Sequence, residues 1–375
     1  MDKLDIKVGY TCNNNCIHCV IKPNVMGMNC DGSKLDLTTE EVKANIEDAL
    51  RQGVKDIVLT GGEMTMRDDF LELIQFLADK VEEYGICPCI SLQTNGRELG
   101  RYVEFIHGLT LDFNYVIALH SSKEELHNKI VGNKKDESNP FQETMFAITE
   151  IQRLYGNFND VARIELVISS YNIDDITSTV EDLADLGLFN IGISYPHLSG
   201  YENIFNMQYI KDTGTGYPHF LQEKMRVGEN LVHKIGIPYT KIREIMPKLL
   251  QIAATRHEIN LMLEEFPVCV FRDENGKFIG PSSNLFIMSH DTNQEMYVNY
   301  PDRIIEAKDT VRLYMEEHKK DKICKFCYLN MQCLGIWKES MNTFGTEGLQ
   351  YVTKEEFHSR YKDLDAYFKE LSDEE

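Results

Sequence analysis

The sequence predicts an α/β fold in which helices cover a parallel β-sheet. Six short apolar runs of strand length alternate with segments of helical periodicity over roughly the first 200 residues. Polar and sulfur-bearing residues follow the first four runs directly, at the edge where parallel strands place their ligands. The chain has 375 residues, which is enough for one large α/β unit and an appendage.

The expected elements follow one another in a regular order. A helix begins at Thr38, where Thr-Thr-Glu-Glu supplies an N-cap and an acidic first turn. Because six βα units follow in succession, the strands are expected to lie parallel, with the helices outside. The expected strands are residues 6–10, 56–60, 89–93, 114–120, 163–168 and 190–195, and the later helices are 68–83, 140–154 and 173–186.

Composition and charge exclude several classes of protein. Apolar residues make up 42% and charged residues 26%, which disfavours disorder. The net charge of −21 repels phosphate backbones, and the basic run 318–322 is short and flanked by Glu316 and Glu317, so no nucleic-acid partner is expected. No apolar run reaches the roughly 18 residues that span a bilayer, and the first residues carry no secretory signal. We therefore expect a cytoplasmic protein with no membrane partner.

Ten cysteines without an export signal indicate metal or redox sites, because disulfides are rare in a reducing cytosol. Cys12, Cys16 and Cys19 have the spacing C-x3-C-x2-C. Three thiolates on one loop can hold three irons of a [4Fe–4S] cluster and leave one corner open, where S-adenosylmethionine (SAM) can chelate. A zinc loop is the alternative, and it needs a fourth ligand, for which His18 is a candidate.

The run Cys-Asn-x-x-Cys-x-His-Cys resembles the signature of the radical SAM superfamily. Thr60-Gly61-Gly62-Glu63 resembles the second motif of that family, with Met64 where proline is usual. The resemblance implies a partial (βα)6 TIM-like barrel over about residues 4–200, and reductive cleavage of SAM to a 5′-deoxyadenosyl radical that abstracts hydrogen. It also implies an electron donor such as flavodoxin or ferredoxin, His18 near the adenine, and the Gly61–Glu63 loop around the SAM amino group. Glycines there would let a ligand approach the backbone closely.

Further SAM contacts are expected at the ends of the third and fourth strands. Asn95 is either a contact of the ligand or turn chemistry in Thr94-Asn95-Gly96. His120 and Ser121 contact the ribose or carboxylate of SAM, or Ser121 caps a helix. Glu165 alternates with apolar neighbours on the fifth strand, so an inward position would mark a site and an outward one an ordinary surface.

A second cysteine group, Cys324, Cys327 and Cys333, has the spacing C-x2-C-x5-C, and Cys269 lies upstream as a fourth candidate. Spacing alone fits zinc or [4Fe–4S] equally. The segment resembles the SPASM/twitch extension of radical SAM enzymes, with Trp337 where a further cysteine is usual. The resemblance implies one auxiliary [4Fe–4S] cluster on these four cysteines, serving electron transfer or structure. If Cys269 is no ligand, an open iron could bind substrate. The remaining cysteines are Cys30, Cys87 and Cys89, which we expect to be plain thiols.

The resemblance favours an enzyme that matures a ribosomally made peptide or protein. The alternatives are oxidation or rearrangement of a small molecule, and a non-catalytic iron–sulfur or zinc protein. The cysteine loop begins at residue 12, which leaves no room before it for a peptide-recognition domain, so a separate recognition protein is a possible partner. The expected domains are residues 1–200 as the radical SAM core, 201–267 as a helical connection, 268–350 as the auxiliary-cluster region, and 351–375 as a C-terminal helix with an acidic tail. Within them, helices are expected near 219–234 and 242–257, irregular structure over 268–350, and one amphipathic helix over 354–371.

Overall fold

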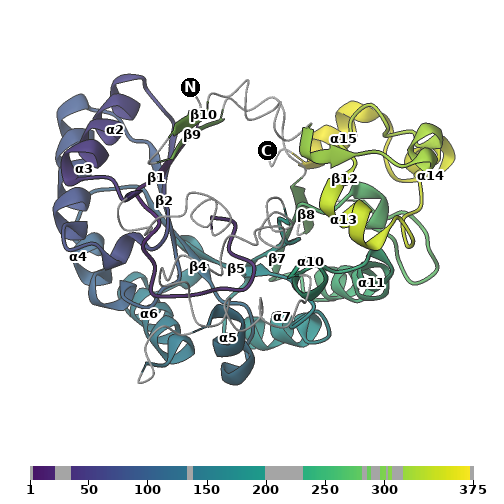
Figure 1. The fold of residues 1–375 in the computed structure, drawn as a ribbon, viewed down its shortest axis with the longest axis horizontal. Helices are drawn as coiled ribbons and strands as arrows, with labels where there is room; N and C mark the ends of the chain where they lie inside the picture. The colour runs from purple at the N-terminus through teal and green to yellow at the C-terminus, as the bar shows by residue number, and fades with distance from the viewer. Residues whose placement is uncertain are drawn as a thin grey trace, which may run out of the picture.

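The computed structural model describes residues 3–21, 35–132, 138–198, 231–280, 285–288, 296–300, 303–305 and 316–371. Its main feature is a curved sheet of ten strands with helices on the outside (Figure 1). The order is β10-β9-β1-β2-β3-β4-β5-β6-β7-β8, and every neighbouring pair is parallel except β9 and β10. The strands are β1 (Lys3–Lys7), β2 (Asp56–Thr60), β3 (Cys89–Thr94), β4 (Phe113–Ala118), β5 (Ala162–Val167), β6 (Asn190–Ser194), β7 (Asn260–Glu264), β8 (Leu285–Met288), β9 (Met296–Tyr300) and β10 (Arg303–Ile305). The predicted α/β fold is confirmed.

The helices begin and end where local sequence signals place them. Thr38 and Glu41 form a capping box at the start of α2, and Gly85 closes α3 in the left-handed conformation with φ 61°. Asn139 caps α6, which has Pro140 in its first turn. The helices around the sheet are α2 (Thr39–Arg51), α3 (Phe70–Tyr84), α4 (Val103–His107), α5 (Glu124–Val131), α6 (Pro140–Tyr155), α7 (Ile176–Asp185), α10 (Leu231–Ile235) and α11 (Tyr239–Thr255), with short 3-10 turns η2 (Met64–Met66), η3 (Leu99–Arg101), η4 (Phe158–Asp160) and η6 (Val268–Val270).

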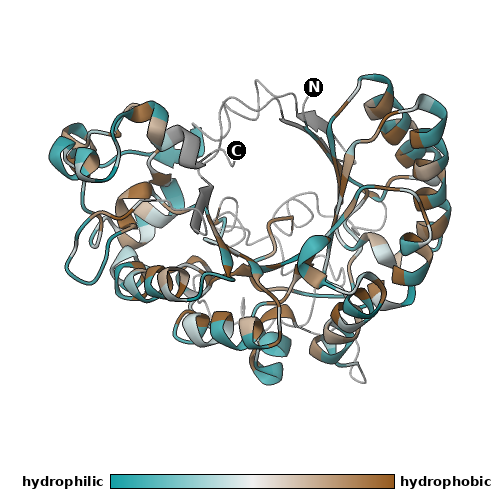
Figure 2. Ribbon diagram, turned by 180° about the vertical axis from the view of Figure 1, so that it is seen from behind, coloured by the Kyte–Doolittle hydropathy of each residue, from teal (hydrophilic) through white to brown (hydrophobic). Residues whose placement is uncertain are grey.

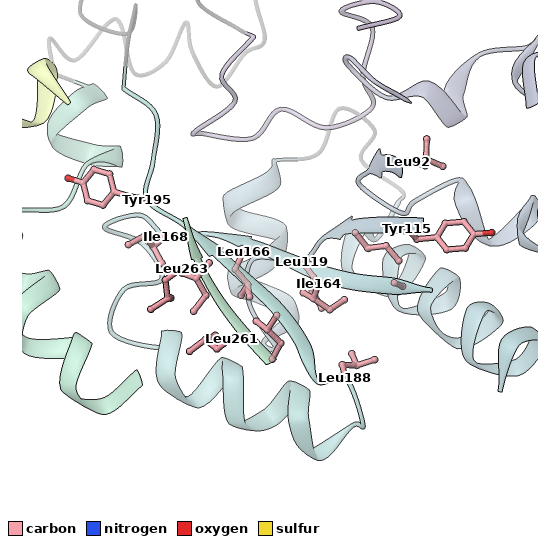
Figure 3. Packing of buried hydrophobic residues seen from close by; sticks show 14 of the residues in the cluster. Leu92, Tyr115, Leu119, Ile164, Leu166, Ile168, Leu188, Tyr195, Leu261 and Leu263 are labelled. Atoms are coloured by element: carbon pink, nitrogen blue, oxygen red, sulfur yellow. The ribbon is translucent and has the colours of Figure 1, made fainter. Parts of the chain in front are cut away.

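The core lies between the sheet and this outer layer of helices. Apolar residues concentrate on the strands and on the helix faces turned toward them (Figure 2). On β5, Ile164 and Leu166 are fully buried, and they lie among Leu119, Leu188 and Leu263 in the close view (Figure 3). Each such side chain stabilises the fold by about 1.5–3 kcal/mol on burial. The alternate residues of β5, such as Glu165, therefore occupy the opposite face, inside the curve of the sheet.

The sheet extends beyond the six strands that the sequence predicts. β7 lies in the range expected to be a helical connection, and β8, β9 and β10 lie in the range expected to be irregular. β9 pairs with β1, so the first strand of the chain is not an edge strand. These strands are three to five residues long, and pairing with a distant neighbour decides whether such short runs become strands. The expected helix near 242–257 is present as α11, whereas most of the one expected near 219–234 lies outside the described residues.

The C-terminal region packs against the β7–β8 side of the sheet, near α10 and α11 (Figure 1). It contains the small antiparallel pair β11 (His318–Lys319) and β12 (Ile336–Trp337), the 3-10 turn η7 (Lys322–Phe326), and three helices, α13 (Lys338–Phe344), α14 (Lys354–Arg360) and α15 (Leu364–Leu371). The single helix expected over 354–371 is wrong. Tyr361 is extended (φ −120°, ψ 140°), and the Asp363 carboxylate accepts a hydrogen bond from the Ala366 N–H at 2.9 Å, which starts a new helix.

No helix in the described part of the chain is long and apolar enough to cross a membrane.

Candidate active site

The first cysteine loop leaves the carboxyl end of β1 and is fixed by its backbone. Asn15 N–H donates to the Val131 carbonyl at 2.7 Å, and Ile17 N–H donates to the Ile130 carbonyl at 3.1 Å, so the loop is held against the end of α5. Cys12, Cys16 and Cys19 are half-buried and form no disulfide. Their thiols are therefore held on one short loop at the edge of the sheet where the sequence predicts ligands.

The Gly61-Gly62 loop after β2 lies directly against the start of the cysteine loop. Gly62 N–H donates to the Gly9 carbonyl and Glu63 N–H to the Thr11 carbonyl, each at 2.8 Å. A Cβ on Gly62 would lie 2.0 Å from the Thr11 carbonyl oxygen, and Gly61 has φ 145°. The sequence predicts that these glycines let a ligand approach the backbone closely. In the structure, they let the loop after β2 approach the cysteine loop closely.

The Glu63 carboxylate is buried and already has four protein donors. Its Oε1 accepts from the Thr65 N–H at 3.1 Å and from the hydroxyls of Thr65 and Thr94 at 2.6 and 2.8 Å. Its Oε2 accepts from the Asn95 N–H at 2.7 Å. Burial raises the pKa of Glu63, and the hydrogen bonds from Thr65, Asn95 and Thr94 oppose that shift. The carboxylate thus ties the end of β2 to the end of β3.

Asn95 joins this edge of β3 to the cysteine loop. Its amide Nδ2 donates to the Asn13 side-chain oxygen at 2.7 Å and lies 3.7 Å from the Cys12 sulfur. Its own Oδ1 accepts from the Arg97 N–H at 3.0 Å, which is turn chemistry. Asn95 therefore makes the predicted turn and also contacts the cysteine loop, and its contact with SAM stays a prediction.

Sequence reasoning missed Arg97, which is 7% exposed and holds the same loop. Its Nη1 donates to the Asn13 carbonyl at 3.0 Å and to the Asn14 side chain at 2.9 Å, and its Nε pairs with Glu143. The sequence offers one signal for Arg97, which is its position directly after the turn Thr94-Asn95-Gly96. That signal is weak, because arginines are common in turns and the burial of a side chain is not visible in the sequence.

Two histidines face each other beside Cys16. The rings of His18 and His120 are 4.5 Å apart and nearly perpendicular, and ligand atoms of Cys16, His18 and His120 lie within 4.8 Å of one another. Burial lowers the pKa of His120 to about 4, so it is neutral at pH 7. Its Nδ1 accepts from the Val167 N–H at 3.1 Å, which assigns its proton to Nε2. His120 is therefore a fixed N–H donor.

Ser121 forms a local turn and does not cap a helix, because the N-cap residue of α5 is Lys123, whose side chain makes no capping hydrogen bond. Its hydroxyl is fully buried and accepts from the Lys123 N–H at 3.0 Å, just before α5. This contact is a serine turn at the start of a helix.

Residues 6–153 match the family model described as the radical SAM superfamily. The chain carries a radical SAM domain. It is 31% identical over 129 residues to a probable GTP 3′,8-cyclase of Thermococcus kodakarensis, covering 34% of this chain and 38% of that protein. It is 35% identical over 96 residues to the GTP 3′,8-cyclase of Tolumonas auensis, covering 26% of each. The chain thus spans well under half of the curated relatives that it matches.

Solved structures of low identity share the fold of this chain. Streptococcus suis SuiB bound to S-adenosylmethionine has a TM-score of 0.54 at 15% identity, covering 94% of this chain and 76% of that one. Native anSMEcpe with bound AdoMet and the Cp18Cys peptide has a TM-score of 0.51 at 14% identity, covering 98% of this chain and 97% of that one. The predicted resemblance to the radical SAM family and the predicted fold are confirmed.

The second cysteine group lies outside the matched residues and is brought together by folding. Cys269, Cys324, Cys327 and Cys333 line one cavity, although Cys269 is 55 residues from the next of them. Burial raises the pKa of the Cys269 thiol, and the nearby Cys333, Cys327 and Cys324 thiols raise it further. Four thiols that line one cavity fit a cationic centre, because a metal offsets the repulsion between thiolates.

Trp337, at the position where a further cysteine is usual, has a packing role. It is fully buried, and its ring lies 4.2 Å from that of His197 and 4.0 Å from that of His318. His197 follows β6, so Trp337 packs the auxiliary region onto the sheet.

Glu165 faces the inside of the curved sheet. Of the two positions considered for it, this is the one that indicates a functional site. It accepts from the Ser194 hydroxyl at 2.6 Å, and Arg163 Nη2 lies 3.6 Å from it and 3.5 Å from Glu264. Burial and the Glu264 charge raise the pKa of Glu165 to about 7.

Proposed function

We propose that this protein is a radical SAM enzyme with a [4Fe–4S] cluster on Cys12, Cys16 and Cys19. When bound, that cluster supplies the electron that cleaves SAM to a 5′-deoxyadenosyl radical, which abstracts hydrogen from the substrate. The observation that carries the proposal is the placement of the cysteine loop. It lies against the Gly61-Gly62 loop at the carboxyl ends of β1 and β2, within the residues that match the family.

The surrounding residues position this loop and offer contacts for SAM. The Gly61–Glu63 backbone, Asn95 and His120 line the edge where SAM would lie, with His18 toward the adenine. Glu63 acts as a positioning residue, because its four protein donors leave its oxygens engaged. The neutral His120 can donate from Nε2 to an anionic group such as a carboxylate.

The zinc alternative for the first loop takes Cys12, Cys16 and Cys19 with His18 as the fourth ligand, whereas the structure brings together a different group. Cys16, His18 and His120 lie within 4.8 Å of one another, whereas a structural zinc site takes four protein ligands. No fourth metal-ligating side chain joins this group among the described residues. The family match and the three cysteines together favour iron.

The auxiliary cavity would hold a second [4Fe–4S] cluster on Cys269, Cys324, Cys327 and Cys333. All four thiols line the cavity, so each iron of a cube would have a protein ligand. Full ligation favours a role in electron transfer or structure over direct binding of substrate.

A peptide or protein is the proposed substrate, and a small molecule is the second candidate. The identity to GTP 3′,8-cyclases over about a third of the chain favours the small molecule, with GTP as the example that their names print. The charge of the protein favours the peptide. The net charge is −21, and Glu165 and Glu264 lie together on the inner face of the sheet, which repels a triphosphate and suits a basic peptide.

The test measures the iron content per chain and the cleavage of SAM in three matched variants. Two cubes predict about eight irons per chain after anaerobic reconstitution. Replacing Cys12, Cys16 and Cys19 by Ala should leave about four irons and abolish dithionite-driven release of 5′-deoxyadenosine. Replacing Cys324, Cys327 and Cys333 should remove the other four, and Cys87→Ala with Cys89→Ala is the control.

Two outcomes would contradict the proposal. Cleavage of SAM by the first triple variant would move the site elsewhere, and stoichiometric zinc in anaerobically purified protein would exclude the auxiliary iron cluster. Deuterium transfer into 5′-deoxyadenosine from labelled peptide, compared with labelled GTP, decides between the two substrates.

A further inference from the structure

Two large apolar side chains are exposed on the loops that carry the auxiliary cysteines. Phe326 precedes Cys327 and is 72% exposed, and Met331 lies two residues before Cys333 and is 85% exposed. These are the two most exposed large apolar residues in the described part of the chain. Tyr351 is 37% exposed, and its ring lies 6.0 Å from that of Phe326. Exposed aromatic and methionine side chains that gather in this way indicate an interaction surface.

Four lysines lie in the same segment as Phe326. Lys319, Lys320, Lys322 and Lys325 are all exposed and lie within seven residues. The segment 319–333 holds one acidic residue, Asp321, whose oxygens accept from the Ile323 N–H at 3.0 Å and the Thr346 hydroxyl at 3.1 Å. The segment 319–333 is therefore basic on a chain whose net charge is −21, although Glu316 and Glu317 lie just before it.

The basic face is continuous with the cysteine cavity. Lys319, Lys320 and Tyr351 line that cavity together with Cys324 and Cys327. A partner on this face would lie beside the four thiols.

We propose that residues 319–331 and Tyr351, here called the lysine face, dock an acidic one-electron carrier protein. The inference rests on the proposed function, since it gives the auxiliary cysteines an external redox partner. Transient redox complexes bury little surface, and an apolar centre with a charged rim suits them. Complementary charge steers such partners to one face, and the rest of this acidic chain would repel an acidic carrier.

The experiment measures binding of FMN-loaded bacterial flavodoxin to the reconstituted full chain by biolayer interferometry. The double variant Lys322→Glu/Lys325→Glu should weaken binding at least tenfold at low salt and flatten its salt dependence. Arg243→Glu/Lys248→Glu is the control, because both residues are exposed on α11 and the charge change is the same. Met331→Ser should also weaken binding, whereas Leu186→Ser, at a site 55% exposed, should not.

Iron content and dithionite-driven SAM cleavage are measured on the same samples and should not change. If flavodoxin binds the two charge variants equally, or does not bind the wild type, the docking proposal is wrong while the proposed function stands. If the iron-loaded protein fails to cleave SAM with dithionite, the proposed function is wrong. The binding data would still test whether flavodoxin docks on the lysine face. Concentration-dependent dimerisation that is lost in Met331→Ser would assign the face to a second copy of this chain. Competition between RNA and flavodoxin would assign it to RNA, and either result would overturn the proposal.

Discussion

Replacing Glu63 by Gln tests whether the carboxylate is a structural tie between β2 and β3. Gln keeps the shape but exchanges one acceptor oxygen for an NH2 donor. If that NH2 takes the place of Oε2, it faces the Asn95 N–H, which then has no acceptor. If it takes the place of Oε1, it faces three donors, so the first orientation costs less.

The magnitude follows from these contacts. A buried N–H that loses its acceptor costs about 1–3 kcal/mol, and the remaining bonds lose their charge assistance. We expect a total of about 3 kcal/mol, concentrated at the Asn95 amide. Because each 1.4 kcal/mol is a factor of ten, amide exchange there should accelerate by about a hundredfold.

The assay is hydrogen–deuterium exchange of a peptide containing Asn95, beside equilibrium dialysis with SAM. Glu83→Gln is the control, because the Glu83 side chain is 60% exposed on α3. SAM affinity should fall at least tenfold in Glu63→Gln, because Asn95 moves with its lost contact, and iron content should not change. Unaltered exchange at Asn95 would show that Glu63 is protonated and does not link β2 to β3. That result would refute the structural role of the carboxylate.

Three further predictions follow from buried contacts. Gly62→Ala should abolish iron binding at the first cysteine loop, since its Cβ would lie 2.0 Å from the Thr11 carbonyl; Gly53→Ala has open surroundings and should cost only about 1 kcal/mol in urea unfolding. Arg97→Met should destabilise by about 2–3 kcal/mol and speed iron loss to a chelator, because the Asn13 carbonyl and the Asn14 side chain lose a buried charged donor; equal rates in variant and wild type would contradict this. Burial raises the pKa of Glu165 to about 7, so its favourable contribution is complete below about pH 4.5 and is lost as pH rises through 7. Glu165→Gln should therefore gain stability relative to wild type as pH rises from about 4.5 to 7, with a plateau of about 3 kcal/mol above that range, and a difference independent of pH between about 4 and 8 would exclude the mechanism.

Local signals in the sequence determined the main elements and the first half of the site. The capping box at Thr38 and the apolar alternation of β5 act between near neighbours, so they are visible without a fold. The C-x3-C-x2-C spacing is also local, and it placed Cys12, Cys16 and Cys19 on one loop after β1.

Only the tertiary structure decided the contacts between distant segments. β9 is a strand because it pairs with the edge of β1. Cys269 and Cys324 line one cavity because two segments 55 residues apart pack together. Whether a glycine faces a ligand or another loop depends on what lies opposite it, and Thr11 lies opposite Gly62. The burial of Arg97 depends in the same way on three loops that meet at one edge of the sheet. Such contacts follow from the order and curvature of the strands, which periodicity and spacing along the chain do not specify.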